Sequence, residues 1–334
     1  MKNFLSKLPK AELHLHIEGS LEPELMFALA QRNKIEIPYK TIEEVKEAYK
    51  FSCLQDFLNI YYAGASVLIQ EEDFYDLTMA YLTKCHEENI VHTEIMFDPQ
   101  THTERGIAFE TVINGIQKAR NEAQEKWGIS SFLIMSYLRH LSEEAAFKTL
   151  EQSLPFKHLI KAVGLDSSEK GNPPSKFYKV FEASAKAGFI LLAHAGEEGP
   201  AEYVWEAIDG LKIIRIDHGN NCLTDEKLVN EIIQRDMALT VCPLSNLELK
   251  VVTDLKDHPL KMMLDKGIKA TVNSDDPAYF GGYLNQNFIA IQEALNLSKA
   301  DVVLLAKNSF QYSLLEENRK KELLDLVDDY ALKN

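Results

Sequence analysis

Eight short apolar stretches recur along the 334-residue chain, and longer segments with helical spacing separate most of them. The stretches read AELHLHIEG (11–19), VHTEIMFDP (91–99), SFLIMSYLRH (131–140), LIKAVGLDSS (159–168), FILLAHAGEE (189–198), IIRIDHGN (213–220), ALTVCPLSN (238–246) and IKATVNSDDP (268–277). Strands that alternate with helices favour a parallel sheet, and eight such units favour its closure into a barrel. The sequence therefore predicts an α/β fold, a (β/α)8 TIM barrel.

The segments between these stretches complete the predicted barrel. Helices are expected at 111–127, 143–152, 174–187, 202–208, 224–235 and 259–266. The residues in excess of a minimal barrel lie mostly at 20–89, which is expected to form a helical insertion after the first strand, with helices at 25–32 and 51–70. No tandem repeat or low-complexity linker divides the chain, so residues 1–334 are expected to form a single domain.

The composition of the chain limits the kinds of molecule that it is expected to bind. The formal net charge is −15, and no basic stripe with interleaved aromatic residues is present, so neither nucleic acid nor a membrane is expected as a partner. The four cysteines are scattered without a C-x-x-C pair, and we expect buried thiols in a reducing compartment. The first residues lack the apolar core of a signal peptide, so a cytoplasmic location is expected. The oligomeric state is left open.

Chemically active side chains stand at the ends of four predicted strands. They are His14, His16 and Glu18 in the first, His194 and Glu197 in the fifth, His218 in the sixth, and Asp275 and Asp276 in the eighth. Alternation along a strand places His14 and His16 on the same face. Active sites of this fold lie at the carboxyl ends of the strands, so residues distant in sequence are expected to meet at one mouth of the barrel.

A catalytic zinc site explains this combination of residues. Zinc in such sites takes three or four nitrogen and oxygen ligands and activates a water molecule, whose pKa falls to about 7. The candidate ligands are His14, His16, His194 and Asp275. Glu197 lies close enough in sequence to His194 to exchange a proton near the metal, and His218 could take the proton of the water or hold the hydroxide. The remaining histidines are interpreted as surface or structural residues: His86, His92, His102, His140, His158 and His258.

From LPKAELHLHIEG near its start to NSDDP in the last predicted strand, the sequence resembles the adenosine/adenine deaminase family of the amidohydrolase superfamily. The resemblance implies a zinc-dependent barrel with one zinc ion per subunit, held by the four candidate ligands. It further implies that Glu197 protonates N1 of a purine ring and that His218 assists the hydroxide. Asp276 would accept a hydrogen bond at N7, and the backbone N–H of Gly164 would face N3.

Glu18 bears on the choice of purine. Members that act on adenosine have aspartate at this position of the motif H-x-H-x-D-G, where it engages the ribose. The longer Glu18 side chain would reach into the space of a ribose and accept the N9–H that only the free base carries. The segments GLDSSEKGNPPSKF and SDDPAYFGGY also resemble the adenine deaminase branch. We therefore expect hydrolytic deamination of adenine to hypoxanthine and ammonia, with a small purine base as the only partner.

Other functions remain open to different degrees. Adenosine, an N6-substituted adenine or another adenine-bearing metabolite could react on the same barrel. The other class of zinc deaminase requires H-x-E and P-C-x-x-C, which are absent. A binuclear amidohydrolase would usually have a bridging lysine at the end of the fourth strand, whereas Lys161 stands at its start. A barrel with a purely structural zinc would have no use for an acid and a base beside the metal.

Overall fold

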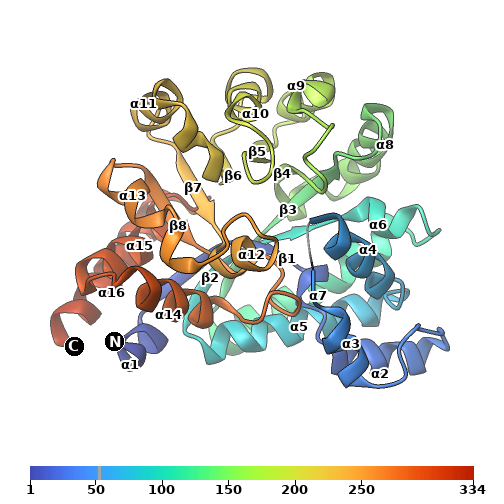
Figure 1. The fold of residues 1–334 in the computed structure, drawn as a ribbon. Helices are drawn as coiled ribbons and strands as arrows, with labels where there is room; N and C mark the ends of the chain where they lie inside the picture. Colours follow the sequence, from blue (N-terminus) through green and yellow to red (C-terminus); the bar gives the residue numbers. More distant parts are fainter. Residues whose placement is uncertain (52–53) are drawn as a thin grey trace.

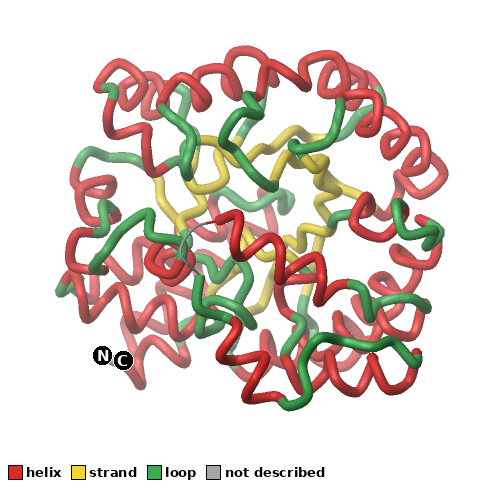
Figure 2. The backbone as a smooth tube through the Cα atoms, turned by 45° about the vertical axis from the view of Figure 1, so that its right-hand side comes forward, coloured by secondary structure: helices red, strands yellow, loops and turns green. Residues whose placement is uncertain are grey.

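A computed structural model describes residues 1–51 and 54–334. Within this part of the chain, eight parallel strands form one sheet in sequence order, curled into a barrel with helices around it (Figures 1 and 2). The strands are β1 (Lys10–His16), β2 (Ile90–Phe97), β3 (Ser130–Leu138), β4 (Ile160–Asp166), β5 (Ile190–Ala195), β6 (Arg215–His218), β7 (Ala238–Val241) and β8 (Lys269–Val272). Each coincides with one of the eight apolar stretches, so the predicted (β/α)8 barrel is confirmed.

The strands end earlier than the apolar stretches do. Glu18 lies beyond β1 in a short 3-10 helix, η1 (Glu18–Ser20). The stretch 238–246 is strand only to Val241, and helix α12 (Pro243–Glu248) occupies its second half. Proline suits the first turn of a helix, where its missing N–H would have no partner, so the prediction of strand was wrong there.

Helices follow most of the strands, as expected. They include α6 (Pro99–Thr103), α7 (Phe109–Trp127), α8 (Glu143–Ser153), α9 (Tyr178–Lys186), α10 (Ala201–Glu206), α11 (Glu226–Gln234) and α13 (Leu260–Asp265). Helix α7 stops at Gly128, whose φ of 72° is a left-handed conformation that glycine adopts at little cost. The expected helix at 174–187 begins as a 3-10 turn, Pro174–Phe177, before α9.

Between β1 and β2 the chain forms several helices, as the sequence predicts. They are α2 (Pro23–Asn33), α3 (Ile42–Ala48), α4 (Leu54–Ala65) and α5 (Glu71–Glu87). Of the helix expected at 51–70, residues 52–53 lie outside the described residues, and α4 accounts for its centre. Helix α5 packs beside α7 and so takes the place of the barrel helix that follows β1. The inserted part is therefore η1 to α4.

The seam between β8 and β1 is closed by a short backbone contact together with side chains. A single parallel bridge joins Leu15 and Asp275, and the N–H of His16 donates to the carbonyl oxygen of Asp275 at 3.0 Å. Further down the seam, the amide oxygen of Asn273 accepts the N–H of Leu13 at 2.9 Å. The side-chain amide of Asn273 thus takes the place of a backbone hydrogen bond between strands. The barrel closes without regular pairing between β1 and β8.

Helices α14 (Leu284–Leu295), α15 (Lys299–Gln311) and α16 (Glu317–Lys333) complete the chain beyond β8. Helix α16 returns to α1 (Lys2–Lys7), where the hydroxyl of Tyr330 donates to the carbonyl oxygen of Phe4 at 3.0 Å, so the two termini lie close together (Figure 1). None of the described helices combines the length and apolar character needed to cross a membrane. Cys85, Cys222 and Cys242 are buried free thiols, as expected, while Cys53 lies outside the described residues.

Candidate active site

A pocket lies at the carboxyl ends of the strands. Its wall consists of His16, Leu54, Phe57, Leu58, Tyr61, Tyr62, Asp98, Asp166, Ser167, His194, Glu197, His218, Leu249, Asp275 and Asp276. The apolar and aromatic part comes largely from α4, while the barrel supplies the polar part. This combination of an apolar wall with a few converging polar groups is typical of a small-molecule site.

Imidazole and carboxylate groups from three parts of the barrel converge at the base of the pocket. Nε2 of His14 lies 3.1 Å from Oδ1 of Asp275, and Nε2 of His16 lies 3.5 Å from the same oxygen. Nε2 of His16 is 3.2 Å from Nε2 of His194. Two ligands that share a tetrahedral zinc at about 2.1 Å lie about 3.4 Å apart. These three spacings are of that size, although the group whose ligand atoms all lie within 4.8 Å of one another consists of His14, His194, Asp275 and His218 and does not include His16.

His218 belongs to the same cluster. Ligand atoms of His14, His194, His218 and Asp275 all lie within 4.8 Å of one another. Nε2 of His218 is 3.8 Å from Oδ2 of Asp275 and 3.7 Å from Oε2 of Glu197. His218 thus lies between Asp275 and Glu197, where a neutral imidazole can accept a proton.

Charge within the cluster matches a metal-binding role. Burial lowers the pKa of His16 to about 4 and that of His218 to about 3, which keeps both rings neutral and their lone pairs available. Burial opposes the ionisation of Asp275, but the charges of His14 and His218 outweigh it and lower the pKa of this carboxyl. Nε2 of His14 is buried, and the polar atom found beside it is Oδ1 of Asp275, which belongs to another candidate ligand.

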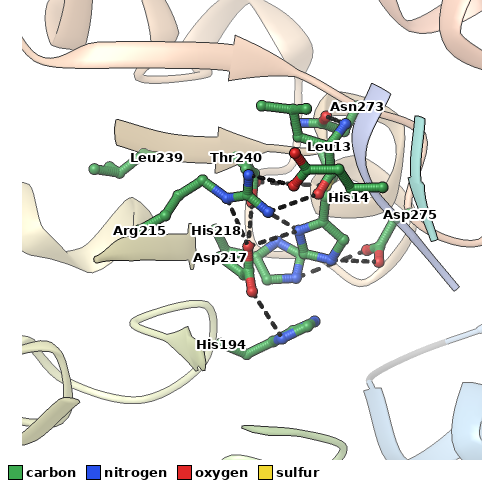
Figure 3. A network of polar contacts seen from close by, with 12 residues as sticks. Leu13, His14, His194, Arg215, Asp217, His218, Leu239, Thr240, Asn273 and Asp275 are labelled. Atoms are coloured by element: carbon green, nitrogen blue, oxygen red, sulfur yellow. Dashed lines mark hydrogen bonds and ion pairs between the residues drawn. The ribbon is translucent and has the colours of Figure 1, made fainter. Parts of the chain in front are cut away.

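Asp217 and Thr240 lie next to the imidazoles of His14 and His194 (Figure 3). The Thr240 hydroxyl donates to Oδ1 of Asp217 at 2.8 Å and also lies 2.8 Å from Nδ1 of His14. Oδ2 of Asp217 is 3.8 Å from Nδ1 of His194. The contact of His194 is longer than a hydrogen bond, whereas the hydrogen bond between Thr240 and His14 is of the kind that fixes the ring orientation of a metal-binding histidine. The sequence did not single out Asp217, because a residue adjacent to His218 on a regular strand would face the other way.

The backbone explains how consecutive residues face the same pocket. His218 and Asp275 both have φ of 64°, a left-handed conformation uncommon for residues other than glycine. It breaks the alternation of a strand, so that Asp217 and His218 both reach the cluster, and Asp275 and Asp276 both line the pocket. Such conformations concentrate at functional sites.

Glu197 is held by a loop that Glu169 organises. The Glu169 carboxylate accepts the N–H groups of Gly196, Glu197, Glu198 and Gly199 at 2.7, 3.0, 3.0 and 2.8 Å. Burial, together with the charge of Asp275, raises the pKa of Glu197 well above its usual value. A carboxyl that keeps its proton in a closed pocket can act as a general acid. The sequence missed Glu169, since its partners lie 27 to 30 residues away.

Glu18 is anchored by two residues that the sequence analysis treated as structural or did not mention. Its Oε1 accepts the Nε2–H of His102 at 2.8 Å and the N–H of Asp98 at 3.2 Å. The guanidinium of Arg105 lies 2.9 Å from Nδ1 of His102. Because arginine can only donate, Nδ1 of His102 accepts and Nε2 carries the proton toward Glu18. His102 is therefore a buried partner of a candidate site residue, and Oε2 of Glu18 stays without a partner.

The remaining predicted site residues occupy different positions. Asp276 lines the pocket beside Gly19, where a Cβ atom would come within 1.9 Å of its Oδ1. Glu18 and Gly164 are not among the lining residues: Glu18 accepts the backbone N–H of Asp98, which does line the pocket, and Gly164 lies within β4, paired with Ser136 of β3. Ser167 is the residue after β4 that reaches the pocket. The contact of Gly164 with a purine stays a prediction.

Comparison with known proteins is consistent with this geometry. Residues 9–330 match the family model described as "Adenosine deaminase". An adenine deaminase from Acinetobacter baylyi is 61% identical over 96% of this chain and 97% of its own length. One from Wolinella succinogenes is 59% identical over 98% of this chain and 99% of its own.

Solved structures agree. The adenine deaminase from Arthrobacter aurescens superposes with a TM-score of 0.96 at 49% identity, covering 98% of this chain and 100% of that one. An amidohydrolase from Burkholderia ambifaria, crystallised with bound Zn, has a TM-score of 0.91 at 24% identity over 100% of this chain and 95% of that one. The second similarity concerns the fold alone.

Proposed function

Because the chain belongs to the adenosine deaminase family, we propose that it is an enzyme that converts adenine and water to hypoxanthine and ammonia. The observation that carries the proposal is the position of Glu197, a buried carboxyl 3.7 Å from His218 and next to a cluster of three imidazoles and a carboxylate. An acid beside a metal-type cluster suits hydrolysis of a ring carbon whose neighbouring nitrogen must gain a proton.

We propose zinc as the metal and His14, His16, His194 and Asp275 as its ligands. Three nitrogens and one oxygen form a donor set that zinc prefers. A zinc ion bound there would supply Lewis-acid activation of a water molecule. Family deaminases depend on a metal, and the Burkholderia protein contains Zn. These similarities support the choice of metal.

In this proposal, Glu197 and His218 carry out the proton transfers of the reaction. Glu197 donates a proton to N1 as the oxygen of water adds to C6, so electron density displaced from the C6–N1 bond is neutralised. His218, neutral in the pocket, accepts a proton from the water. The proton held by His218 then passes to the amino nitrogen, and ammonia leaves as the bond between C6 and this nitrogen breaks. The remaining hydroxyl proton passes to Glu197, so hypoxanthine is formed and both side chains return to their starting protonation states.

Glu18 and Asp276 would select and orient the base. Glu18 accepts the N9–H through its unpartnered Oε2, which a nucleoside cannot satisfy. Adenine with a hydrogen on N9 has none on N7, so in this proposal the Asp276 carboxyl donates at N7 instead of accepting. Burial raises the pKa of Asp276 well above its usual value, in keeping with a protonated group.

A substrate panel tests the proposal. Ammonia release is measured with adenine, adenosine, N6-methyladenine and N6-isopentenyladenine, each with zinc-replete and with chelated protein. We expect adenine to have by far the highest kcat/KM and chelation to abolish turnover. Comparable rates with adenosine would contradict the role of Glu18, and full activity after metal removal would contradict the mechanism.

A further inference from the structure

The loop after β5 carries the candidate acid, Glu197. The side chain of Glu197 lines the pocket, and its Oε2 lies 3.7 Å from Nε2 of His218, which is longer than a hydrogen bond. The position of this carboxyl therefore depends on the backbone that carries it. Residues 196–199, here called the acid loop, belong to neither a helix nor a strand.

Glu169 binds the acid loop from the side of β4. It lies shortly beyond the end of β4 and is only 1% exposed. Its Oε1 accepts the N–H of Gly196, and its Oε2 accepts those of Glu197, Glu198 and Gly199. Hydrogen bonds from N–H groups to a carboxylate are about twice as strong as those between neutral groups. One buried side chain thus satisfies the N–H groups of the whole loop.

Asn221 binds the same loop from the side of β6. It belongs to η5 (Asn220–Thr224), the 3-10 helix that follows β6. Its backbone N–H donates to the carbonyl oxygen of Gly196 at 2.9 Å. Its side-chain amide donates to the carbonyl oxygens of Glu197 and Gly199 at 3.2 and 2.8 Å. The carbonyl groups are therefore bound from one neighbouring strand and the N–H groups from the other.

Together these contacts fix both peptide groups that flank Glu197. In the peptide group before it, the carbonyl oxygen is bound by Asn221 and the N–H by Glu169. In the peptide group after it, the carbonyl oxygen is again bound by Asn221 and the N–H by Glu169. Because the two peptide planes determine the direction of the bond from Cα to Cβ, only the side-chain torsions of Glu197 remain free.

The surrounding residues are adapted to this arrangement. A Cβ atom at residue 199 would lie 2.5 Å from Oε1 of Glu169, so glycine there lets the carboxylate approach the backbone. Arg139 is also buried, and its Nη1 donates to the carbonyl oxygen of His194 at 2.8 Å, near the end of β5. The segment is thus bound both in the strand and in the acid loop.

Resting on the proposed function, we propose that Glu169 and Asn221 are positioning residues that hold the backbone of Glu197 between them, so that its carboxyl meets N1 of the purine. Neither residue touches the substrate in this role, and both act through Glu197. Misplacement of a reacting group by about 1 Å can cost about 100-fold in rate. Loss of either residue should therefore lower kcat and leave KM for adenine largely unchanged.

A double-mutant cycle tests the proposal. The kcat and KM for adenine are measured in E169A, in E197Q and in the variant that carries both changes. We expect E169A to lower kcat by about 100-fold, with KM within about threefold of the wild-type value. In the E197Q background no acid is left to position, so the same change should alter kcat by less than about threefold. An equal loss in both backgrounds would overturn the proposal.

Thermal unfolding and metal analysis separate positioning from support of the fold. E169A should lower Tm by a similar amount in the wild-type and E197Q backgrounds, because the acid loop has the same hydrogen bonds in both. A loss of metal in E169A would overturn the proposal, since the effect would then pass through His194. If E169A does not fold, E169Q takes its place in the cycle, because its amide oxygen can accept only part of the four N–H groups.

Two substitutions test Asn221. N221A removes the amide donor, and N221D places a carboxylate against the two carbonyl oxygens. We expect kcat to fall by about 10-fold in N221A and at least as much in N221D, and only where Glu197 is present. A wild-type kcat in N221D would overturn the role of Asn221. The control is Glu125→Ala, an exposed change on α7, which should keep the wild-type kcat and Tm.

Amide exchange provides a measurement that needs no activity. Peptides that cover residues 196–199 should exchange hydrogen for deuterium faster in E169A than in the wild type, and unchanged protection would overturn the proposal. Failure of the inference differs from failure of the proposed function. A wild-type protein that releases no ammonia from adenine overturns the proposed function, whereas an active wild type with independent effects of E169A and E197Q overturns only the positioning role.

Discussion

The direction in which a side chain points in this pocket depends on the backbone conformation as well as on the type of residue. The φ of 64° at His218 and at Asp275 turns each side chain to the same side as a neighbour in sequence. Two adjacent acids can then take different roles, Asp275 with the imidazoles and Asp276 on the substrate wall. Substitutions that alter a single group and leave its surroundings intact therefore give the clearest tests of these roles.

Substitution of Glu197 by glutamine removes the proton donor while keeping the size of the side chain. We expect E197Q to bind metal as the wild type does and to lose about 100- to 10,000-fold in kcat. Steady-state kinetics with adenine and metal analysis of the purified protein check this. The matched control is Glu202→Gln on the exposed surface of α10, which should keep wild-type kinetics. A near-normal kcat in E197Q would show that another group protonates N1.

Gly19 leaves room for the Asp276 side chain. A Cβ atom at residue 19 would lie 1.9 Å from Oδ1 of Asp276, so G19A must displace this carboxyl. Misplacement of a positioning group by about 1 Å can cost about 100-fold, and we expect a loss of this size in kcat/KM for adenine, with metal content unchanged.

The control for G19A is Gly267→Ala. Gly267 has a φ of +90° and nothing near an added Cβ atom, so alanine there strains the backbone without touching the site. This variant should lower thermal stability but keep the kinetics with adenine. Wild-type kinetics in G19A would contradict the contact with Asp276.

Among the elements, β1 contributes most to the site and has the least regular pairing on one side. Its Glu12 crosses the seam: one carboxyl oxygen accepts the N–H of Ser274 at 3.0 Å, and the other accepts the hydroxyl proton of Tyr81 at 2.7 Å. This contact fixes the segment just before Asp275. A residue of β1 outside the proposed ligand set thus fixes the segment after β8 that carries Asp275, one of the proposed ligands.

Glu12 also predicts a dependence of stability on pH. Burial raises its pKa from the ordinary value of 4.5 to about 7. The folded state therefore holds a proton that the unfolded chain releases near pH 4.5, and the resulting stabilisation is complete below pH 4.5 and lost as pH rises through 7. The change amounts to about 3 kcal/mol in the free energy of unfolding.

The variant Glu12→Gln has no titrating group at this position. Urea unfolding of both proteins between pH 4.5 and 8 should show the wild type losing stability relative to E12Q as pH rises. Parallel curves, with a constant difference in the free energy of unfolding, would contradict an elevated pKa at Glu12.

At the scale of the whole molecule, the proposed metal connects the beginning, middle and end of the chain. Its ligands come from β1, β5 and the segment after β8, where regular pairing between first and last strands is absent. A metal bound only by the folded state stabilises it by about 4 kcal/mol at a thousandfold excess over Kd. We expect chelation to lower Tm by about 6 °C and added zinc to restore it.

The comparison needs a protein that folds but cannot bind the metal. His194→Ala should have the same Tm with and without chelator. A wild-type Tm unaffected by thorough chelation would contradict a metal that links the strands.

The sequence alone sufficed for the architecture because the relevant signals are local. Each apolar stretch and each helical spacing is a property of neighbours in the chain, and eight of them in alternation admit few folds. The same local signals predict that His14, His16, His194 and Asp275 stand at strand ends. Because the carboxyl ends of parallel strands lie on one side of the barrel, these residues were expected to meet there. It failed where a strand stops, as at Val241, because a turn depends on what the next residues contact.

Only the tertiary structure decided which polar side chains surround those residues. Asp98, His102 and Glu169 act through partners that lie 27 to 84 residues away, and no periodicity records such distances. Barrel closure brings these carboxyl and imidazole groups together in a buried space, where a lost hydrogen bond or an unpaired charge costs far more than in water. Local patterns therefore determined the barrel and the kind of chemistry, while the packing of its loops decided which atoms would meet the substrate.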